Sequence, residues 1–246
     1  MDTPKRVAAR PAAQALARTV VFDLDGVLVD VSASYRMAIL RTVAALGGGE
    51  ATPAAVQALK NAGGFNNDWD LSRELLRQRG RQVDLPRVTE VFNQFYLGPG
   101  GDGAGGLIME ESWLLPAELL EGLRQRYRLA IFTGRPRLDA EFVLRRFAVR
   151  EAFEDVVAME DVDQQKPNPE GLLELRRRHA PGRLAAYLGD TVDDARCSVA
   201  AEVPFIAILP AGQLQQEELA ALFRQAGCQN VVGDVAAAAR QLLADD

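Results

Sequence analysis

Three short, almost continuous apolar runs dominate the sequence, and each of them ends in a cluster of polar residues. Runs of this kind are typical of strands that are buried on both faces, as they are in a parallel sheet. Segments of helical length lie between the runs, and this alternation predicts an open α/β sheet with right-handed crossover connections. The runs are Thr19–Phe22, Leu129–Phe132 and Ala185–Leu188, and residues 156–159 and 205–209 have the same character.

The segments that separate and follow these runs carry charged faces and indicate helices. In open α/β sheets, ligands bind beyond the carboxyl ends of the strands. The polar clusters fall at these ends, so we expect the functional site there. The predicted helices cover about residues 116–126, 137–148, 169–178, 192–201 and 215–226.

The stretch from about residue 31 to residue 112 interrupts the alternation, because it has helical patterns and few strand signals. It closes with a glycine-rich segment at 98–106 that formally contains GxGxxG at Gly98, Gly100 and Gly103. A dinucleotide-binding loop needs a strand before it and a helix after it, so we interpret this segment as a linker. We therefore expect a sheet-containing core at 1–30 and 112–246, and a helical domain inserted at 31–111. Its helices are expected at about 33–46, 54–61, 69–80 and 84–97.

Charge and cysteine content exclude several classes of partner. The net charge is −6, which argues against nucleic acid binding through bulk electrostatics. Only Cys197 and Cys228 are present, outside any CxxC spacing, so no thiolate metal site is indicated. No apolar run has membrane-spanning length, and the Ala- and Arg-rich start at 1–18 resembles a frayed leader or short helix more than a transit segment. We expect a cytoplasmic monomer or homodimer with no membrane partner.

The chain contains a single histidine, His179, in the charged stretch 176–179. One histidine excludes histidine-rich metal sites, and a Ser-His-Asp triad would have to use this residue. We expect His179 to be a bystander. Carboxylates, hydroxyls and lysine must then carry most of any catalysis.

Asp23 and Asp25 follow the first apolar run directly, so both carboxylates are expected at the end of that strand. Taken alone, the pair fits an Asx turn closed by Gly26 as well as it fits catalysis. Asp190 and Asp194 occupy the corresponding place after the third run. Acidic groups brought together in this way suit a hard cation, for which Mg²⁺ is the default.

Two further clusters favour one shared site. Thr133 and Gly134 offer a hydroxyl and a backbone amide that suit an oxyanion, and Lys166 supplies a cation between two prolines. Each cluster also has a plain structural interpretation, as a helix cap or a surface lysine. Four such clusters at the same edge of one sheet favour phosphoryl transfer, with a carboxylate as the covalent nucleophile and the cations offsetting charge repulsion.

The ordered motifs of the sequence resemble those of the haloacid dehalogenase superfamily. The resemblance covers the chain apart from its first residues and implies a Rossmann-like parallel sheet. The helical insert after the first motif resembles the C1 cap of subfamily I. The matching positions are Asp23-x-Asp25-Gly26, Thr133, Lys166 and Gly189-Asp190-x-x-x-Asp194.

This resemblance implies the roles of the motif residues. Asp23 would be the nucleophile that becomes an aspartyl phosphate. Asp25 would protonate the leaving oxygen and then deprotonate the hydrolytic water. Thr133, Gly134 and Lys166 would bind the transferring phosphoryl group.

The metal site is implied in the same way. Mg²⁺ would be held by the Asp23 carboxylate, the Asp25 backbone carbonyl and Asp190. Asp194 would orient waters or Lys166 from behind the metal. The neighbouring Asp193 is expected to cap a helix.

Asp25 also narrows the reaction, because dehalogenases of the superfamily lack this second aspartate. We therefore expect hydrolysis of a small phosphorylated metabolite. A phosphomutase of the β-phosphoglucomutase type has the same motif residues and stays open as an alternative, as does a non-catalytic metabolite-binding domain. Glu202 departs from the Ala-Gly that many relatives have at 201–202, which affects a turn rather than the site.

The segment Asn66-Asn67-Asp68-Trp69 is the least ordinary part of the insert, and we expect it to contribute substrate specificity. Its polar groups would suit a polar or amine-bearing leaving group. Equally, its amides or acid could cap the next helix while Trp69 packs inside the insert. Arg135, two residues after Thr133, is expected to form a surface salt bridge or to add a charge at the mouth of the site.

Overall fold

The core is a sheet of six parallel strands, described by a computed structural model that covers residues 18–244. The strand order is β5-β4-β1-β6-β7-β8, so the first strand of the chain lies at the centre. The leader expected at 1–18 falls almost entirely outside the described residues. The strands are β1 (Arg18–Phe22), β4 (Arg128–Phe132), β5 (Asp155–Val157), β6 (Arg183–Gly189), β7 (Phe205–Ile208) and β8 (Val231–Val232).

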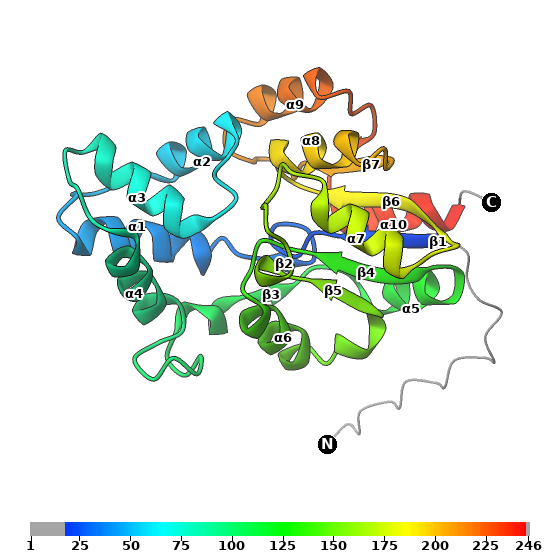
Figure 1. Cartoon of the computed structure of the whole chain (residues 1–246), viewed down its shortest axis with the longest axis horizontal. Coiled ribbons are helices and arrows are strands. Elements are labelled where there is room, and N and C mark those ends of the chain that lie inside the picture. Colours follow the sequence, from blue (N-terminus) through cyan, green and yellow to red (C-terminus); the bar gives the residue numbers. More distant parts are fainter. Residues whose placement is uncertain (1–17, 245–246) are drawn as a thin grey trace.

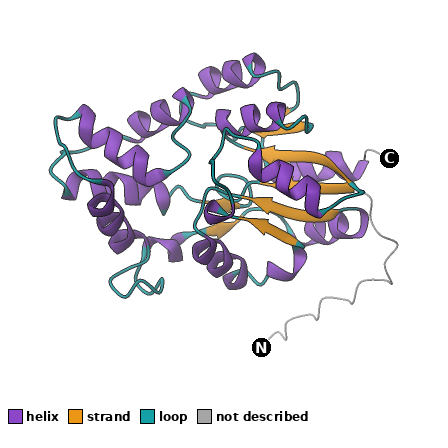
Figure 2. Ribbon diagram, viewed as in Figure 1, coloured by secondary structure: helices purple, strands orange, loops and turns teal. Residues whose placement is uncertain are grey.

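Helices cover both faces of the sheet (Figures 1 and 2). In β1, Val20 and Phe22 pack with α5 (Ala117–Arg126) and α10 (Val235–Ala244), whereas Val21 packs with the helices of the opposite face. This alternation on a buried strand explains why the sequence reads as a continuous apolar run. The remaining helices of the core are α6 (Arg137–Arg146), α7 (Glu170–Arg178), α8 (Val192–Ala200) and α9 (Gln216–Gln225).

Four helices stand at the end of the sheet toward which the strand arrows point (Figure 2). Thr52 begins the second of them by accepting a hydrogen bond from the amide of Ala55, and Asp84 begins the fourth in the same way. We call these helices the cap. They are α1 (Tyr35–Ala45), α2 (Pro53–Ala62), α3 (Asp68–Gln78) and α4 (Leu85–Tyr96). Within residues 18–244, no helix is long and apolar enough to cross a membrane.

The chain passes between core and cap at two neighbouring places. There β2 (Val29–Asp30) pairs antiparallel with β3 (Ser112–Trp113). The glycine-rich loop joins α4 to the 3-10 turn η1 (Leu107–Glu110), so no strand precedes it, in agreement with a linker. The carboxyl end of the central strand β1 therefore faces the cap, and the loop that follows β1 lies between the core and the cap.

Candidate active site

Asp23 follows β1 directly and is the buried acid at the centre of the site. Lys166 donates from Nζ to Oδ1 of Asp23 at 2.9 Å and lies 2.8 Å from Oδ1 of Asp194. Asp194 is held in place by Tyr187, whose hydroxyl donates to it at 2.6 Å. Lys166 as a whole residue is 3% exposed. Its ammonium lies over the Phe132 ring, 4.8 Å from the ring centroid. Lys166 therefore bridges the first and last motifs of the sequence.

The acid cluster fits a hard cation. Asp23, Asp190 and Asp194 each offer a carboxylate oxygen within 4.8 Å of the others. Oδ1 of Asp190 is buried and has no hydrogen-bond partner. Gly26 makes room for this carboxylate, since a Cβ at position 26 would lie 2.1 Å from Oδ2 of Asp190. A buried carboxylate oxygen without a hydrogen-bond partner fits a ligand of Mg²⁺.

Electrostatics support this assignment. Burial raises the pKa of Asp23 well above its ordinary value, although Lys166 opposes the shift. Burial, together with the Asp194 charge, raises the pKa of Asp190 to about 7. Burial would also raise the pKa of Asp194, but the ammonium of Lys166 and hydrogen bonds from Thr191 and Tyr187 lower it. A cation bound beside Asp23 and Asp190 would relieve the penalty that two clustered carboxylates impose on each other.

The predicted phosphate-binding residues follow the neighbouring strand β4. Thr133 is buried, and its Oγ1 accepts a hydrogen bond from the amide of Arg135 at 3.1 Å. Gly134 lines the cleft between core and cap. A Cβ at position 134 would lie 2.1 Å from Nδ2 of Asn66, so the cap reaches the core here. This Nδ2 is buried and has no hydrogen-bond partner, which leaves an amide donor among the residues that line the cleft.

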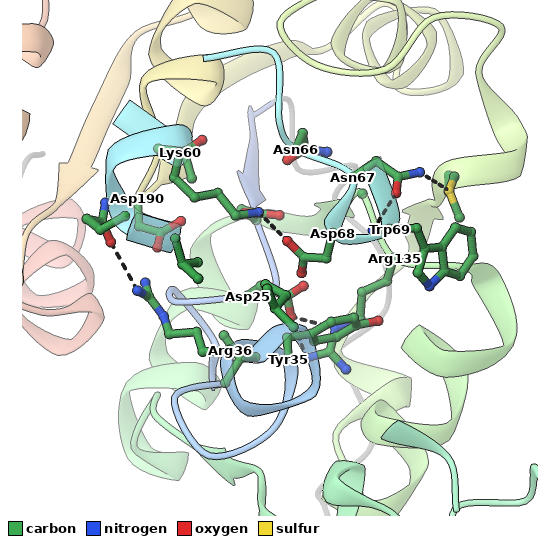
Figure 3. A pocket seen from close by; sticks show the side chains of 18 of the residues that line it. Asp25, Tyr35, Arg36, Lys60, Asn66, Asn67, Asp68, Trp69, Arg135 and Asp190 are labelled. Atoms are coloured by element: carbon green, nitrogen blue, oxygen red, sulfur yellow. Dashed lines mark hydrogen bonds and ion pairs between the residues drawn. The ribbon is translucent and has the colours of Figure 1, made fainter. Parts of the chain in front are cut away.

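The cleft encloses about 970 Å³ of empty space, part of it open to solvent, and Figure 3 shows its lining. Asn67 begins α3 by accepting from the amides of Trp69 and Asp70 at 2.9 and 3.2 Å. Asp68 forms an ion pair with Lys60 at 2.5 Å. Trp69 lines the cleft and packs against the main hydrophobic cluster. All four predicted cap residues lie at the cleft, but two of their polar groups are already engaged within the cap.

The structure corrects the interpretation of Arg135. Its side chain is buried rather than at the surface, and it contacts the Asp25 carboxylate (Figure 3). The sequence could not show this because a second, buried acid neutralises the arginine. That acid is Glu111, which lies in the segment returning from the cap, 24 positions from Arg135.

Asp193 is the second correction. Its side chain does not cap a helix, because α8 begins at Thr191, which accepts from the amide of Asp194. Instead, Oδ2 of Asp193 accepts a hydrogen bond from the amide of Gly64 at 2.7 Å. Gly63 and Gly64 both have a φ of +81°, a conformation that glycine adopts without steric cost. Asp193 is thus a contact between the core and the cap.

Two further residues of the cleft carry charge that sequence reasoning did not single out. Asp139, in the first turn of α6, is largely buried, and burial raises its pKa to about 6. Arg36, from α1, donates to Gln57 at 3.0 Å and forms no ion pair with a carboxylate among the described residues. Asp139 and Arg36 lie within helices and belong to none of the sequence motifs, so no sequence signal pointed to either residue.

The single histidine lies at the other end of the sheet. Burial lowers the pKa of His179, which favours the neutral ring. Its Nδ1 accepts from Thr19 Oγ1 at 2.8 Å, and its Nε2 donates to Asp155 Oδ2 at 2.7 Å, as these partners require of a neutral imidazole. Thr19 and Asp155 belong to the amino ends of β1 and β5. Thr19 and His179 are buried, Asp155 is partly exposed, and all three lie at the end of the sheet opposite Asp23.

Replacing His179 with Ala is expected to lower the free energy of unfolding by about 2–4 kcal/mol, because buried Thr19 and partly exposed Asp155 lose a hydrogen bond and a cavity forms. The turnover number should stay within about twofold of the wild-type value. Chemical denaturation and steady-state assays would measure both quantities. A large loss of turnover in a stable variant would make the hydrogen-bonded chain of Thr19, His179 and Asp155 part of the catalytic machinery.

Known proteins give the chain its family. The model for "Hydrolase: haloacid dehalogenase-like hydrolase" matches residues 17–201. A protein of Phytophthora nicotianae named imidazoleglycerol-phosphate dehydratase is 36% identical over 184 residues, which are 72% of this chain. The chain spans only 40% of that protein's length. The phosphoglycolate phosphatase of Cupriavidus necator is 31% identical over 193 residues, 75% of this chain and 78% of that protein.

A solved structure agrees with the sequence relatives. Phosphatase Tt82 from Thermococcus thioreducens has a TM-score of 0.66 and 26% identity, and the match covers 93% of this chain and all of that one. The family model spans all four motifs, from Asp23 to Asp194. The chain therefore belongs to the haloacid dehalogenase-like hydrolase family.

Proposed function

We propose that the chain is a Mg²⁺-dependent phosphatase that hydrolyses a small phosphate monoester through an aspartyl phosphate on Asp23. One observation carries this proposal: a buried carboxylate, bonded to Lys166, lies at the floor of the cleft beside an acid with an unpaired oxygen. The only histidine of the chain, His179, is bonded to Thr19 and Asp155 at the other end of the sheet, so no histidine can serve as the nucleophile. A carboxylate is then the natural covalent group for phosphoryl transfer.

In the first step, a carboxylate oxygen of Asp23 attacks phosphorus and forms a new P–O bond. The bond between phosphorus and the leaving oxygen breaks, and Asp25 donates a proton to that oxygen so that an alcohol departs. Lys166 and the donors of Thr133 and Gly134 stabilise the charge on the phosphoryl oxygens. Acid–base help of this kind contributes about 10²–10⁴-fold to the rate.

In the second step, Asp25 takes a proton from a water molecule, and the water oxygen attacks phosphorus. The P–O bond to Asp23 breaks, which releases inorganic phosphate and regenerates the carboxylate. Asp25 ends the cycle protonated, as it began.

Asp23, Asp190 and the backbone carbonyl of Asp25 would hold the Mg²⁺ ion, with Asp194 fixing Lys166 behind them. Bound there, the ion supplies positive charge that offsets the repulsion between a carboxylate and a phosphate dianion. The orphaned oxygen of Asp190 and the clustered acids support this assignment.

The free polar groups of the cleft favour an acidic leaving group over an amine. Asp68, which would bind an amine, is paired with Lys60. Arg36 forms no ion pair with a carboxylate among the described residues, although its charge opposes the rise in the pKa of Asp190. Asn66 adds an unpaired amide donor. A phosphate monoester with a carboxylate on its leaving group fits these groups, and several relatives are named phosphoglycolate phosphatase.

Phosphate release with Mg²⁺ tests this function. We expect turnover of p-nitrophenyl phosphate. Among small phosphate monoesters assayed side by side, kcat/KM should be higher for phosphoglycolate than for sugar and polyol phosphates, whose leaving groups are neutral. No turnover of any monoester would contradict the phosphatase. A mutase of the β-phosphoglucomutase type would instead isomerise a sugar phosphate and release little free phosphate.

Metal binding gives an independent prediction. Mg²⁺ at about 100 times its Kd should raise the free energy of unfolding by roughly 2.7 kcal/mol, because the ion binds only the folded state. The Asp190→Asn variant should lose most of this stabilisation, whereas Asp163→Asn, which removes an exposed carboxylate, should keep it. Thermal unfolding with and without Mg²⁺ measures the effect. Equal stabilisation of both variants would place the ion elsewhere.

A further inference from the structure

Arg135 is a buried arginine at the junction between the sheet and the cap. Its residue is 1% exposed, and its Cζ lies 4.8 Å from the centroid of the Tyr35 ring. Burying a guanidinium is costly unless its hydrogen-bonding groups are paired. Arginine has five N–H donors in a rigid planar fork, and here the contacts are sufficient to engage all five.

These contacts bridge two carboxylates. Nε and Nη2 contact Oδ1 of Asp25. Nη1 donates to Oε2 of Glu111 at 3.0 Å, and Nη2 donates to Oε1 at 3.2 Å. Nη1 also donates to the hydroxyl of Tyr96 at 2.9 Å. A side chain held on every side has one orientation, and the Asp25 carboxylate that it binds is oriented with it.

The pair formed by Arg135 and Glu111 is bonded to both connections between core and cap. Glu111 lies just before β3, in the segment that returns from the cap, and Tyr96 is the last residue of α4. Ser34, just before α1 in the outgoing segment, donates to Oε1 of Glu111 at 2.8 Å. The two connections therefore meet at the pair formed by Arg135 and Glu111.

We propose that Arg135 is a positioning residue for the acid–base step, which fixes the Asp25 carboxylate and couples it to both connections of the cap. This proposal rests on the proposed function, in which Asp25 transfers the proton. The contact also assigns the two carboxylate oxygens. Oδ1 is engaged by the guanidinium, so Oδ2 is the oxygen left to face the leaving group and the water.

The chemistry of the step follows from this assignment. As the Asp23–phosphorus bond forms and the bond to the leaving oxygen breaks, the Oδ2–H bond of Asp25 gives its proton to the departing oxygen. Asp25 is left as a carboxylate whose Oδ1 stays on Arg135. In the second step, Oδ2 takes one proton back from water. Arg135 gains and loses no proton in either step.

The test uses the leaving group, because only a poor leaving group needs the proton from Asp25. In the 246-residue chain with Mg²⁺, Arg135→Lys keeps the charge but loses the planar fork. We expect the rate of alcohol release from an alkyl phosphate to fall by about 10²-fold, within the range for general acid catalysis. The burst of p-nitrophenolate from p-nitrophenyl phosphate, which reports the first step alone, should fall by less than about threefold. KM should stay nearly constant, because Arg135 acts through Asp25 rather than on the substrate.

Two further variants keep the proposal open to refutation. The double variant Arg135→Gln/Glu111→Gln removes the arginine together with its fully buried partner, and leaves only the partly exposed Asp25 carboxylate unpaired. It should show the same dependence on the leaving group if the lysine variant does not fold. In an Asp25→Asn background, Arg135→Lys should cause no further loss, since the group that it positions has gone.

The outcomes separate the two proposals. Equal losses on both substrates, or a full additional loss in the Asp25→Asn background, would mean that Arg135 only supports the fold, and would overturn the positioning role. If Asp25→Asn alone does not discriminate between the two leaving groups, the acid–base role of Asp25 fails, and with it the proposed function on which this inference rests.

Discussion

Asp23→Asn is expected to reduce phosphate release by at least about 10⁴-fold, because an amide oxygen is a poor nucleophile and forms no stable acyl phosphate. The shape of the side chain is unchanged, so the fold and the hydrogen bond to Lys166 should remain. Steady-state release of phosphate from p-nitrophenyl phosphate, with circular dichroism as a check on folding, measures the effect.

Asp163→Asn is the matched control for this substitution. It makes the same change of charge at an exposed position and should leave turnover within about twofold of wild type. If Asp23→Asn kept wild-type turnover, another group would have to be the nucleophile, and the mechanism given above would be wrong.

Lys166→Met is expected to impair both stability and catalysis. The ammonium separates two buried acids, Asp23 and Asp194, at 2.9 and 2.8 Å. Removing one partner of a buried ion pair leaves an uncompensated charge and costs about 3–5 kcal/mol of unfolding free energy. Turnover should fall by about 10²–10³-fold, as it does when a donor to a developing oxyanion is lost.

A second variant isolates the electrostatic cause of this effect. Lys166→Met/Asp194→Asn should be more stable than Lys166→Met alone, because it removes one of the two buried charges left without a partner. Both are compared by chemical denaturation. If the double variant were less stable than the single one by the full cost of losing Asp194, the ion pair would not explain the role of Lys166.

The sheet was predictable because its strands are buried on both faces. β1, β4 and β6 appear as continuous apolar runs, and each lies within two residues of its expected place. β8 and β2 have two residues each, which is too short to form a pattern. α10 was missed because its alanine-rich sequence lacks the charged face by which the other core helices were found.

The residues at the strand ends could be found because motif spacing places them at one edge of the sheet. The structure brings Asp23, Asp190 and Lys166 together there. Arg135 was misjudged because its pairing with Glu111 depends on the packing of the cap connections. Asp193 was misjudged because its partner is a backbone amide in the cap, which no sequence pattern records. Long-range contacts of this kind are specified by the fold as a whole.

Glu202 shows how a departure from the family pattern is accommodated. The residue has a φ of +54°, in the left-handed region that glycine adopts easily. The glycine that the family resemblance implies at this position would adopt this φ without steric cost. The strain lies in an exposed turn after α8, away from the acids of the site.

The central claim, a covalent phosphoryl group on Asp23, can be measured directly. In the Asp25→Asn variant with Mg²⁺ and p-nitrophenyl phosphate, the first step proceeds with a good leaving group, whereas hydrolysis lacks its base, so the intermediate should accumulate. Borohydride reduces an acyl phosphate to the alcohol, and peptide mass spectrometry should then find homoserine at position 23, only when substrate is present. A stoichiometric burst of p-nitrophenolate with residue 23 recovered as unmodified aspartate would contradict the account.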